Sequence, residues 1–143
     1  MPVKISAGAV VYRREEGNTK YLLLHYQSGH WDFPKGNVER GEAERETVAR
    51  EVAEETGISD VVFREGFREE IRYFYMREGR TIFKKVVFYL TEARTHEVKL
   101  SYEHIGYDWL SYEEALGRLT YRNAKDILKK AHDFLVRENF DDR

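Results

Sequence analysis

The densest set of side chains that could do chemistry lies between Gly36 and Ile58, in the segment GNVERGEAERETVAREVAEETGI. Hard divalent cations such as Mg²⁺ prefer oxygen ligands, and they commonly bridge a few carboxylates to the phosphates of a substrate. Glu51, Glu54 and Glu55 supply such carboxylates. In a helix Glu51 and Glu55 stack one turn apart, where like charges repel unless a cation balances them. One interpretation of the segment is therefore a metal site beside a phosphate chain.

Arg50 lies inside this acidic segment and leaves a second interpretation open. On a helix it can reach Glu54 at i+4 or Glu46 at i−4. There it would orient metal ligands, or it would only decorate the surface. A run of Glu and Arg on a helix is ordinarily a solvated face, so residue types alone do not decide between the two.

The glutamates can act together only if the segment is helical, and its pattern predicts a helix from Ala43 to Thr56. Gly57 stands where a left-handed residue commonly closes a helix. At about 100° per residue one apolar face forms, which can pack on a sheet and which the glutamates border. Its members are Val48, Ala49, Val52 and Ala53.

Strand patterns flank this helix on both sides. Two helices are predicted after them: a short one begun by a capping box of Ser111 and Glu114, and one from Asn123 to Glu138. The segment Gln27 to Gly36 is predicted as a loop, and a turn at Glu78 to Arg80 joins two strands as a hairpin. The predicted strands are Val3–Tyr12, Tyr21–Tyr26, Val61–Phe67, Glu70–Arg77, Thr81–Leu90 and Glu103–Leu110.

Composition narrows the class of protein. The chain has 143 residues, 41% of them hydrophobic, which predicts one domain over residues 1–143. A net charge of -2 argues against binding long nucleic acid or an anionic membrane, and the absence of cysteine excludes disulfides and thiolate chemistry. The chain start lacks a signal-peptide pattern, and no apolar run approaches the roughly 20 residues of a membrane span. We therefore expect a cytoplasmic protein.

The spacing of the acidic segment resembles a known family signature. From Gly36, five residues lead to Glu42, seven more lead to Arg50, and Glu51-Val-Ala-Glu-Glu-Thr-Gly-Ile58 follows. Every fixed position of the Nudix hydrolase signature is matched. The resemblance implies an α/β/α sandwich around a central mixed β-sheet, and hydrolysis of a nucleoside diphosphate linked to a further group.

By position, the resemblance implies three metal ligands, with Mg²⁺ as the expected ion and Mn²⁺ as the alternative: Glu51, Glu54 and Glu55. Glu51 is the first choice for deprotonating the attacking water, although relatives differ in which residue does so. The predicted catalytic set is Glu51, Glu55 and Arg50.

Segments outside the signature resemble the asymmetric diadenosine tetraphosphate hydrolases, whose products are ATP and AMP. These segments are His30–Gly36 (HWDFPKG) and Tyr102–Ala115 (YEHIGYDWLSYEEA). By that resemblance Glu103 is a further metal ligand, and Tyr75 and Tyr121 stack on a base. Tyr73 has the same strand parity as Tyr75 and could take its place. The alternatives are a solvated loop acid for Glu103 and cross-strand packing for the tyrosines.

Localised positive charge is also needed to hold a polyphosphate, and Lys35 and Lys84 are the candidates. Lys85 points to the opposite face of its strand from Lys84, so only one of the two should face the site. His30 could donate to a phosphate or protonate a leaving group. Each of these residues could instead be merely solvated.

Other functions are also compatible with this sequence. A Nudix enzyme could act on RNA 5′ ends, nucleoside triphosphates or diphosphoinositol phosphates, and a non-catalytic nucleotide-sensing module could retain the fold. The complete set of glutamates argues against a sensor. The expected partner is a nucleotide polyphosphate, and the protein is expected to be a monomer or a homodimer.

Overall fold

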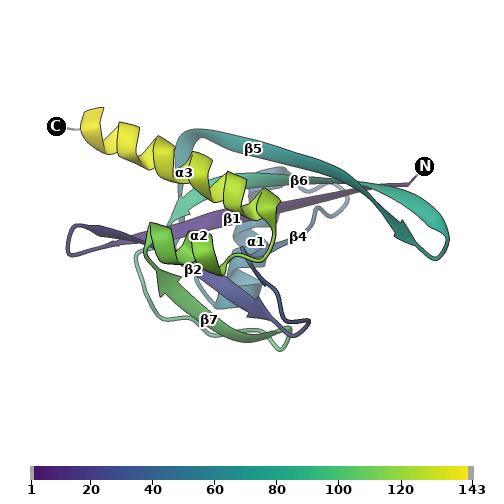
Figure 1. Cartoon of the computed structure of the whole chain (residues 1–143), viewed down its shortest axis with the longest axis horizontal. Helices are drawn as coiled ribbons and strands as arrows, with labels where there is room; N and C mark the ends of the chain where they lie inside the picture. Colours follow the sequence, from purple (N-terminus) through teal and green to yellow (C-terminus); the bar gives the residue numbers. More distant parts are fainter. Residues whose placement is uncertain (1, 142–143) are drawn as a thin grey trace.

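The computed structural model describes residues 2–141, and side chains up to residue 138. It is a mixed β-sheet with helices packed against both faces (Figure 1). The strands are β1 Val3–Glu15, β2 Asn18–Tyr26, β3 Trp31–Asp32, β4 Lys35–Asn37, β5 Val62–Arg77, β6 Arg80–Glu92 and β7 His104–Leu110. The helices are α1 Glu44–Thr56, α2 Tyr112–Arg118 and α3 Arg122–Asp141.

The sheet has the order β3-β2-β1-β6-β5, while β4 pairs with β1 and β7 pairs with β2. β1 and β6 run parallel and the other pairs are antiparallel. The hairpin turn between β5 and β6 holds Glu78 and Gly79 at positive φ, 52° and 73°. Two left-handed central residues suit the twist of a tight hairpin, so the predicted turn is confirmed.

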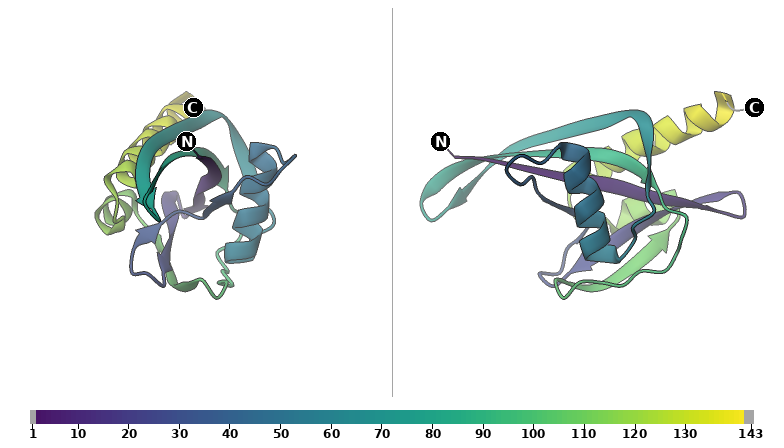
Figure 2. Two further views of the ribbon diagram at one scale, coloured as in Figure 1. Left: turned by 90° about the vertical axis from the view of Figure 1, so that its right-hand side faces the viewer. Right: turned by 180° about the vertical axis from the view of Figure 1, so that it is seen from behind.

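Alternation along the central strands builds two cores, one on each face of the sheet. Val10 and Tyr12 of β1 join the core covered by α2 and α3, whereas Ala9 and Val11 join the core covered by α1. Figure 2 shows the two helical layers on opposite sides of the strands. The predicted α/β/α sandwich around a mixed sheet is therefore confirmed, and the helix predicted at Ala43 to Thr56 is α1.

The segment predicted as a loop from Gln27 to Gly36 differs from that prediction, because it contributes two short strands. β3 pairs with the end of β2, and β4 pairs with Ser6–Gly8 of β1. Such short strands carry no periodicity of their own, and long-range partners decide that they are strands. Phe33, fully buried between them, anchors the segment.

Two predicted strands after α1 also merge into the single strand β5. Its pairing with β6 shifts register between Phe63 and Arg68, which interrupts the alternation in the sequence. The β5–β6 hairpin and the start of β1 extend beyond the helices at one end of the molecule (Figures 1 and 2). No helix in the described part of the chain has the length and apolar character to cross a bilayer.

Candidate active site

Helix α1 is set at both ends by local contacts. At its start, the Ala43 backbone N–H donates to Glu46 Oε1 over 2.8 Å, which satisfies one of the free donors of the first turn. At its end, Gly57 adopts φ 76° and its N–H donates to the Ala53 carbonyl. Because Glu46 caps the helix, it does not pair with Arg50, and that predicted alternative is wrong.

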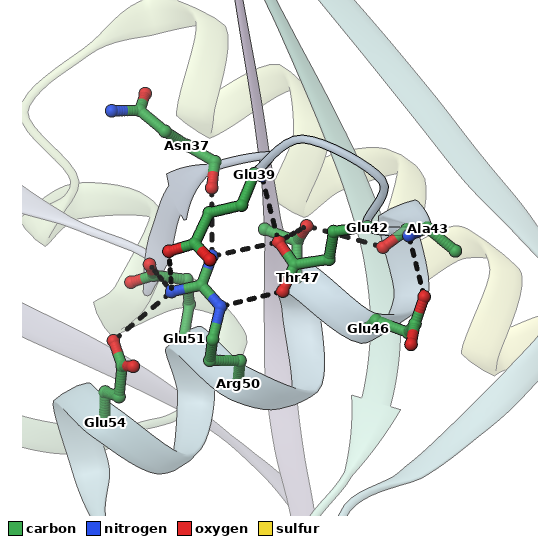
Figure 3. A network of polar contacts seen from close by, with 9 residues as sticks. All are labelled: Asn37, Glu39, Glu42, Ala43, Glu46, Thr47, Arg50, Glu51 and Glu54. Atoms are coloured by element: carbon green, nitrogen blue, oxygen red, sulfur yellow. Dashed lines mark hydrogen bonds and ion pairs between the residues drawn. The ribbon is translucent and has the colours of Figure 1, made fainter.

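Arg50 is the centre of a polar network that ties the preceding loop to the helix (Figure 3). Its Nε donates to Glu42 Oε2 over 2.8 Å, its Nη1 to Glu51 Oε1 over 2.7 Å, and its Nη2 to the Asn37 carbonyl over 3.0 Å. A contact of 3.4 Å reaches Glu54. Hydrogen bonding to Arg50 lowers the pKa of Glu42 to about 2. The planar guanidinium thus fixes the direction of the Glu51 carboxylate.

Glu55 is a buried carboxylate that has no lysine or arginine partner among the described side chains. It is 4% exposed; its Oε1 lies 3.4 Å from the Tyr26 hydroxyl, and its Oε2 has no hydrogen-bond partner in the part of the chain that the structure describes. His104 Nε2 lies 3.1 Å from Oε1 but is not aligned for a hydrogen bond. Burial lowers the pKa of His104, which favours the neutral imidazole. Burial, followed by close contact with the Glu51 side chain and then by the charges of Glu51 and Glu103, raises the pKa of Glu55 to about 9.

The carboxylates around Glu55 can be compared with what a metal ion requires of its ligands. Among the described side chains, residues 2–138, no three acidic or imidazole groups converge closely enough to enclose an ion by themselves. Mg²⁺ does not require such a cage, since it usually keeps waters and substrate phosphates beside one or two carboxylates. The orphaned Oε2 of Glu55, with Glu51 next to it, offers two oxygen donors that a cation would stabilise. The residues present therefore fit a hard divalent ion.

Glu54 and Glu103, the two other predicted metal ligands, lie on the solvent-exposed side of Glu51 and Glu55. The side chain of Glu54 is 59% exposed and turns toward Arg50. Glu103 is exposed too, yet its charge acts on Glu55, so the loop before β7 reaches the same region. Both are within the acidic region, but neither closes a coordination shell in the structure.

A cavity of about 530 Å³ lies on the α3 side of the sheet. Its wall combines aromatic and apolar groups with a few polar ones, the usual make-up of a small-molecule site. The lining residues are His30, Asp32, Lys35, Ile71, Tyr73, Phe88, Tyr121, Asn123 and Ala124. Four of the residues predicted to bind substrate line this one cavity: His30, Lys35, Tyr73 and Tyr121.

The remaining two predicted substrate residues lie next to the cavity rather than in its wall. Tyr75 is on the same face of β5 as Tyr73, with ring centres 6.2 Å apart. Lys84 pairs in register with Tyr73. Lys85 points to the other face, with Nζ 3.8 Å from Glu70 Oε1, which agrees with the prediction that only one lysine faces this side.

The segment Asp32–Gly36 joins the cavity to the glutamates. Lys35 Nζ, at the cavity wall, lies 3.1 Å from Asp32 Oδ2. On the other side of the same segment, a Cβ added to Gly36 would overlap the carboxylate of Glu51. Glycine is therefore required where the Glu51 carboxylate packs against this backbone.

Several residues at the site were missed by sequence reasoning. Tyr26 donates to the Phe33 carbonyl over 2.8 Å and stacks on His30 at 4.5 Å. His104 contacts Glu55, although only its neighbour Glu103 was singled out within the segment Tyr102-Glu103-His104. Asn123 belongs to the first turn of α3 and carries no sequence signal for binding. Tyr26, at the end of an apolar strand, carries none either.

Comparison with known proteins agrees with this geometry. The sequence model of the family described as NUDIX domain matches residues 2–131. The asymmetrical bis(5′-nucleosyl)-tetraphosphatase of Mus musculus is 36% identical, over 91% of this chain and 94% of that protein. The protein of the same name from Caenorhabditis elegans is 33% identical, over 92% of this chain and 96% of that protein. A crystal structure of a C. elegans Ap4A hydrolase binary complex superposes with a TM-score of 0.82 at 32% identity, covering 93% of this chain and 98% of that chain. The chain therefore belongs to the Nudix family.

Proposed function

We propose that this chain, acting as one domain, is an asymmetrical bis(5′-nucleosyl)-tetraphosphatase that hydrolyses diadenosine tetraphosphate (Ap4A) to ATP and AMP. The relatives that bear this name align over more than nine tenths of the chain. The proposal rests on the position of the segment Asp32–Gly36. On one side this segment forms part of the wall of the aromatic cavity, and on the other it packs against the carboxylate of Glu51. A base held in the cavity thereby places its phosphates next to the acidic pair.

The cavity residues bind and orient one end of the substrate. Tyr73 and Tyr121 offer ring faces to a base, and stacking of this kind contributes on the order of 1–3 kcal/mol. His30, whose ring centre lies 5.4 Å from that of Tyr121, extends the same aromatic wall. Burial lowers the pKa of His30, so it acts at neutral pH as a neutral donor to a phosphate oxygen. Lys35 supplies positive charge at the cavity wall.

Glu51 and Glu55 would hold the metal ion, with Glu54 and Glu103 at its exposed side. A bound Mg²⁺ or Mn²⁺ would supply activation of a water and neutralisation of the phosphate charge. Arg50 holds Glu51 Oε1, so Glu51 Oε2 is left to take the proton of the attacking water. Because Arg50 touches the carboxylates and not the cavity, we assign it to positioning Glu51.

The test is incubation of the purified protein with MgCl₂ and a substrate panel, followed by chromatography of the products. The panel contains Ap4A, a nucleoside triphosphate, triphosphorylated RNA and a diphosphoinositol phosphate. We expect ATP and AMP in equal amounts from Ap4A alone. Two molecules of ADP would mean symmetrical cleavage and would contradict the assignment, as would faster cleavage of any other compound in the panel.

A further inference from the structure

Strand β5 forms one edge of the sheet, and the half that leads to the hairpin turn has no strand on its outer side. In the described part of the chain β5 pairs with β6 alone. Residues 69–77 pair with β6 without a break in register, and this end of the hairpin extends beyond the helices (Figures 1 and 2). A long unpaired edge presents its free backbone N–H and C=O groups to another strand.

The hairpin turn determines which backbone groups of this edge point outward. Glu78 and Gly79 form a two-residue turn, so the flanking Arg77 and Arg80 face each other as a hydrogen-bonded pair. Because hydrogen-bonded and non-hydrogen-bonded pairs alternate along an antiparallel ladder, every second residue of β5 directs its N–H and C=O away from β6. The residues that do so within this run are Glu70, Arg72, Phe74 and Met76.

The side chains of these outward residues include two large apolar groups. Phe74 is 61% exposed and Met76 is 65% exposed, and both lie on the face of β5 opposite to the cavity. The Phe74 ring centre lies 5.1 Å from that of Phe83, which is in register with the exposed Val3 of β1. Adjoining exposed apolar side chains of this kind mark a surface where another molecule binds.

The charges on β5 indicate that this molecule is a second copy of the same chain. Two identical edges pair antiparallel about a twofold axis that passes through one residue of β5. An axis at Phe74 would place Glu70 opposite Glu78 of the second copy, and like charges directly opposite each other destabilise a sheet. An axis at Arg72 would place the two copies of this arginine against each other. Both of these registers are therefore disfavoured.

An axis at Tyr73 avoids these contacts and pairs the whole run of residues 69–77. It sets Glu69 of each copy opposite Arg77 of the other, so an oppositely charged pair stands at each end of the contact. Glu69 Oε1 lies 3.0 Å from Lys130 Nζ, whereas Arg77 is exposed and forms no ion pair among the described side chains. An axis at Tyr75 would pair only residues 73–77. The edge is thus most complementary to itself about Tyr73.

We propose that β5 pairs antiparallel with β5 of a second copy about a twofold axis at Tyr73, so that two sheets join into one in a homodimer. In this register Arg72 of each copy lies opposite Phe74 of the other, where its stem and guanidinium cover the ring. The stem of Glu70 covers Met76 in the same way. Because both copies use the same edge, the assembly closes at two chains.

The paired run is short, which sets the expected affinity. Residues 69–77 of each strand span about 30 Å, so the interface is at the small end of protein–protein contacts and the dimer should have a Kd in the micromolar range. The proposal is independent of the proposed reaction, because the acidic pair takes no part in the contact and the test uses no substrate.

Sedimentation velocity tests the proposal with purified protein at about 2–500 μM in about 50 mM NaCl, where charged pairs are screened little. Two variants reverse one charge each: Glu69→Arg and Arg77→Glu. Alone, each variant places like charges opposite each other at both ends of the dimer. Mixed in equal amounts, the two variants form a heterodimer in which both contacts join opposite charges.

We expect the wild type to change from monomer to dimer over this range and each variant alone to raise the dimer Kd at least tenfold. The equimolar mixture should associate with a Kd within threefold of wild type, which also shows that both variants are folded. Lys129→Glu reverses an exposed charge on α3 and should leave the Kd unchanged. Lys130→Ala removes the partner of Glu69 within one copy and should not raise the Kd either.

A wild type that stays monomeric at the highest concentration would overturn the proposal, and so would single variants with an unchanged Kd. A mixture that fails to associate would overturn it too, because the charges would then not face each other across the contact. Assembly beyond two chains would contradict closure at β5.

Discussion

Replacing Glu55 with Gln separates the effect of this buried carboxylate on folding stability from its role in turnover. Glu55 has a pKa raised to about 9 in the folded protein, against an ordinary value of 4.5. In the metal-free protein at pH 7, folding must therefore protonate a group that is ionised when unfolded, at a cost of about 3 kcal/mol from 1.36 kcal/mol per pH unit. Gln removes this cost but buries an amide N–H without an acceptor, which costs about 1–2 kcal/mol.

The variant should thus be more stable than wild type by roughly 1–2 kcal/mol in a chelator at pH 7. The sign follows from the raised pKa: the penalty on wild type is absent below pH 4.5 and grows until the pH passes about 9. The stability difference should therefore vanish or reverse near pH 5 and widen toward pH 8.

Urea denaturation of both proteins at pH 5, 7 and 8 in EDTA measures this difference. Glu54→Gln is the control, because its exposed side chain should change stability by less than about 0.5 kcal/mol. Turnover of Ap4A with Mg²⁺ should fall at least about 100-fold in Glu55→Gln, since several kcal/mol of charge stabilisation are lost. A variant less stable than wild type at pH 8 would show that the carboxylate is structural and would refute the reasoning.

Substitutions at three other positions test the site. Gly36→Ala should displace the Glu51 carboxylate and lower kcat at least about 10-fold, while circular dichroism still reports a folded protein; an unchanged kcat would contradict the close packing of Glu51. Arg50→Lys keeps the charge but loses the fork that joins Glu42 to Glu51, so kcat should fall about 10-fold with little change in KM; a change in KM alone would place Arg50 at the substrate. Tyr73→Ala should raise the KM for Ap4A about 5- to 100-fold from the lost stacking, whereas Tyr73→Phe should stay near wild type; a loss in both variants would mean that the hydroxyl, not the ring, is needed.

The acidic helix is the part of the molecule that local information describes best. Its apolar face, its closing glycine and the spacing of Glu51 and Glu55 all repeat within a few residues, so α1 and the adjacency of the two carboxylates follow from the helix period alone. The long strands and the hairpin turn follow in the same way from alternation and from residues that tolerate positive φ.

Other parts depend on partners that are distant in the chain. β3 and β4 exist because β2 and β1 offer them hydrogen bonds, and no pattern in Gln27 to Gly36 indicates those partners. The choice between Tyr73 and Tyr75 is of the same kind. Both have the strand parity for the site, but only Tyr73 lies where β5 meets the start of α3 and the cavity closes.

The residue types and the helix period were thus sufficient to place a pair of carboxylates on one side of a helix, whereas the divalent ion was indicated by the resemblance of the whole segment to the Nudix signature. The burial of Glu55 beneath Tyr26 and His104, which raises its pKa, was decided by the tertiary structure. The physical reason is that desolvation depends on everything packed around a group. Neighbours in the sequence set the direction of a side chain, whereas only the folded chain removes water from it.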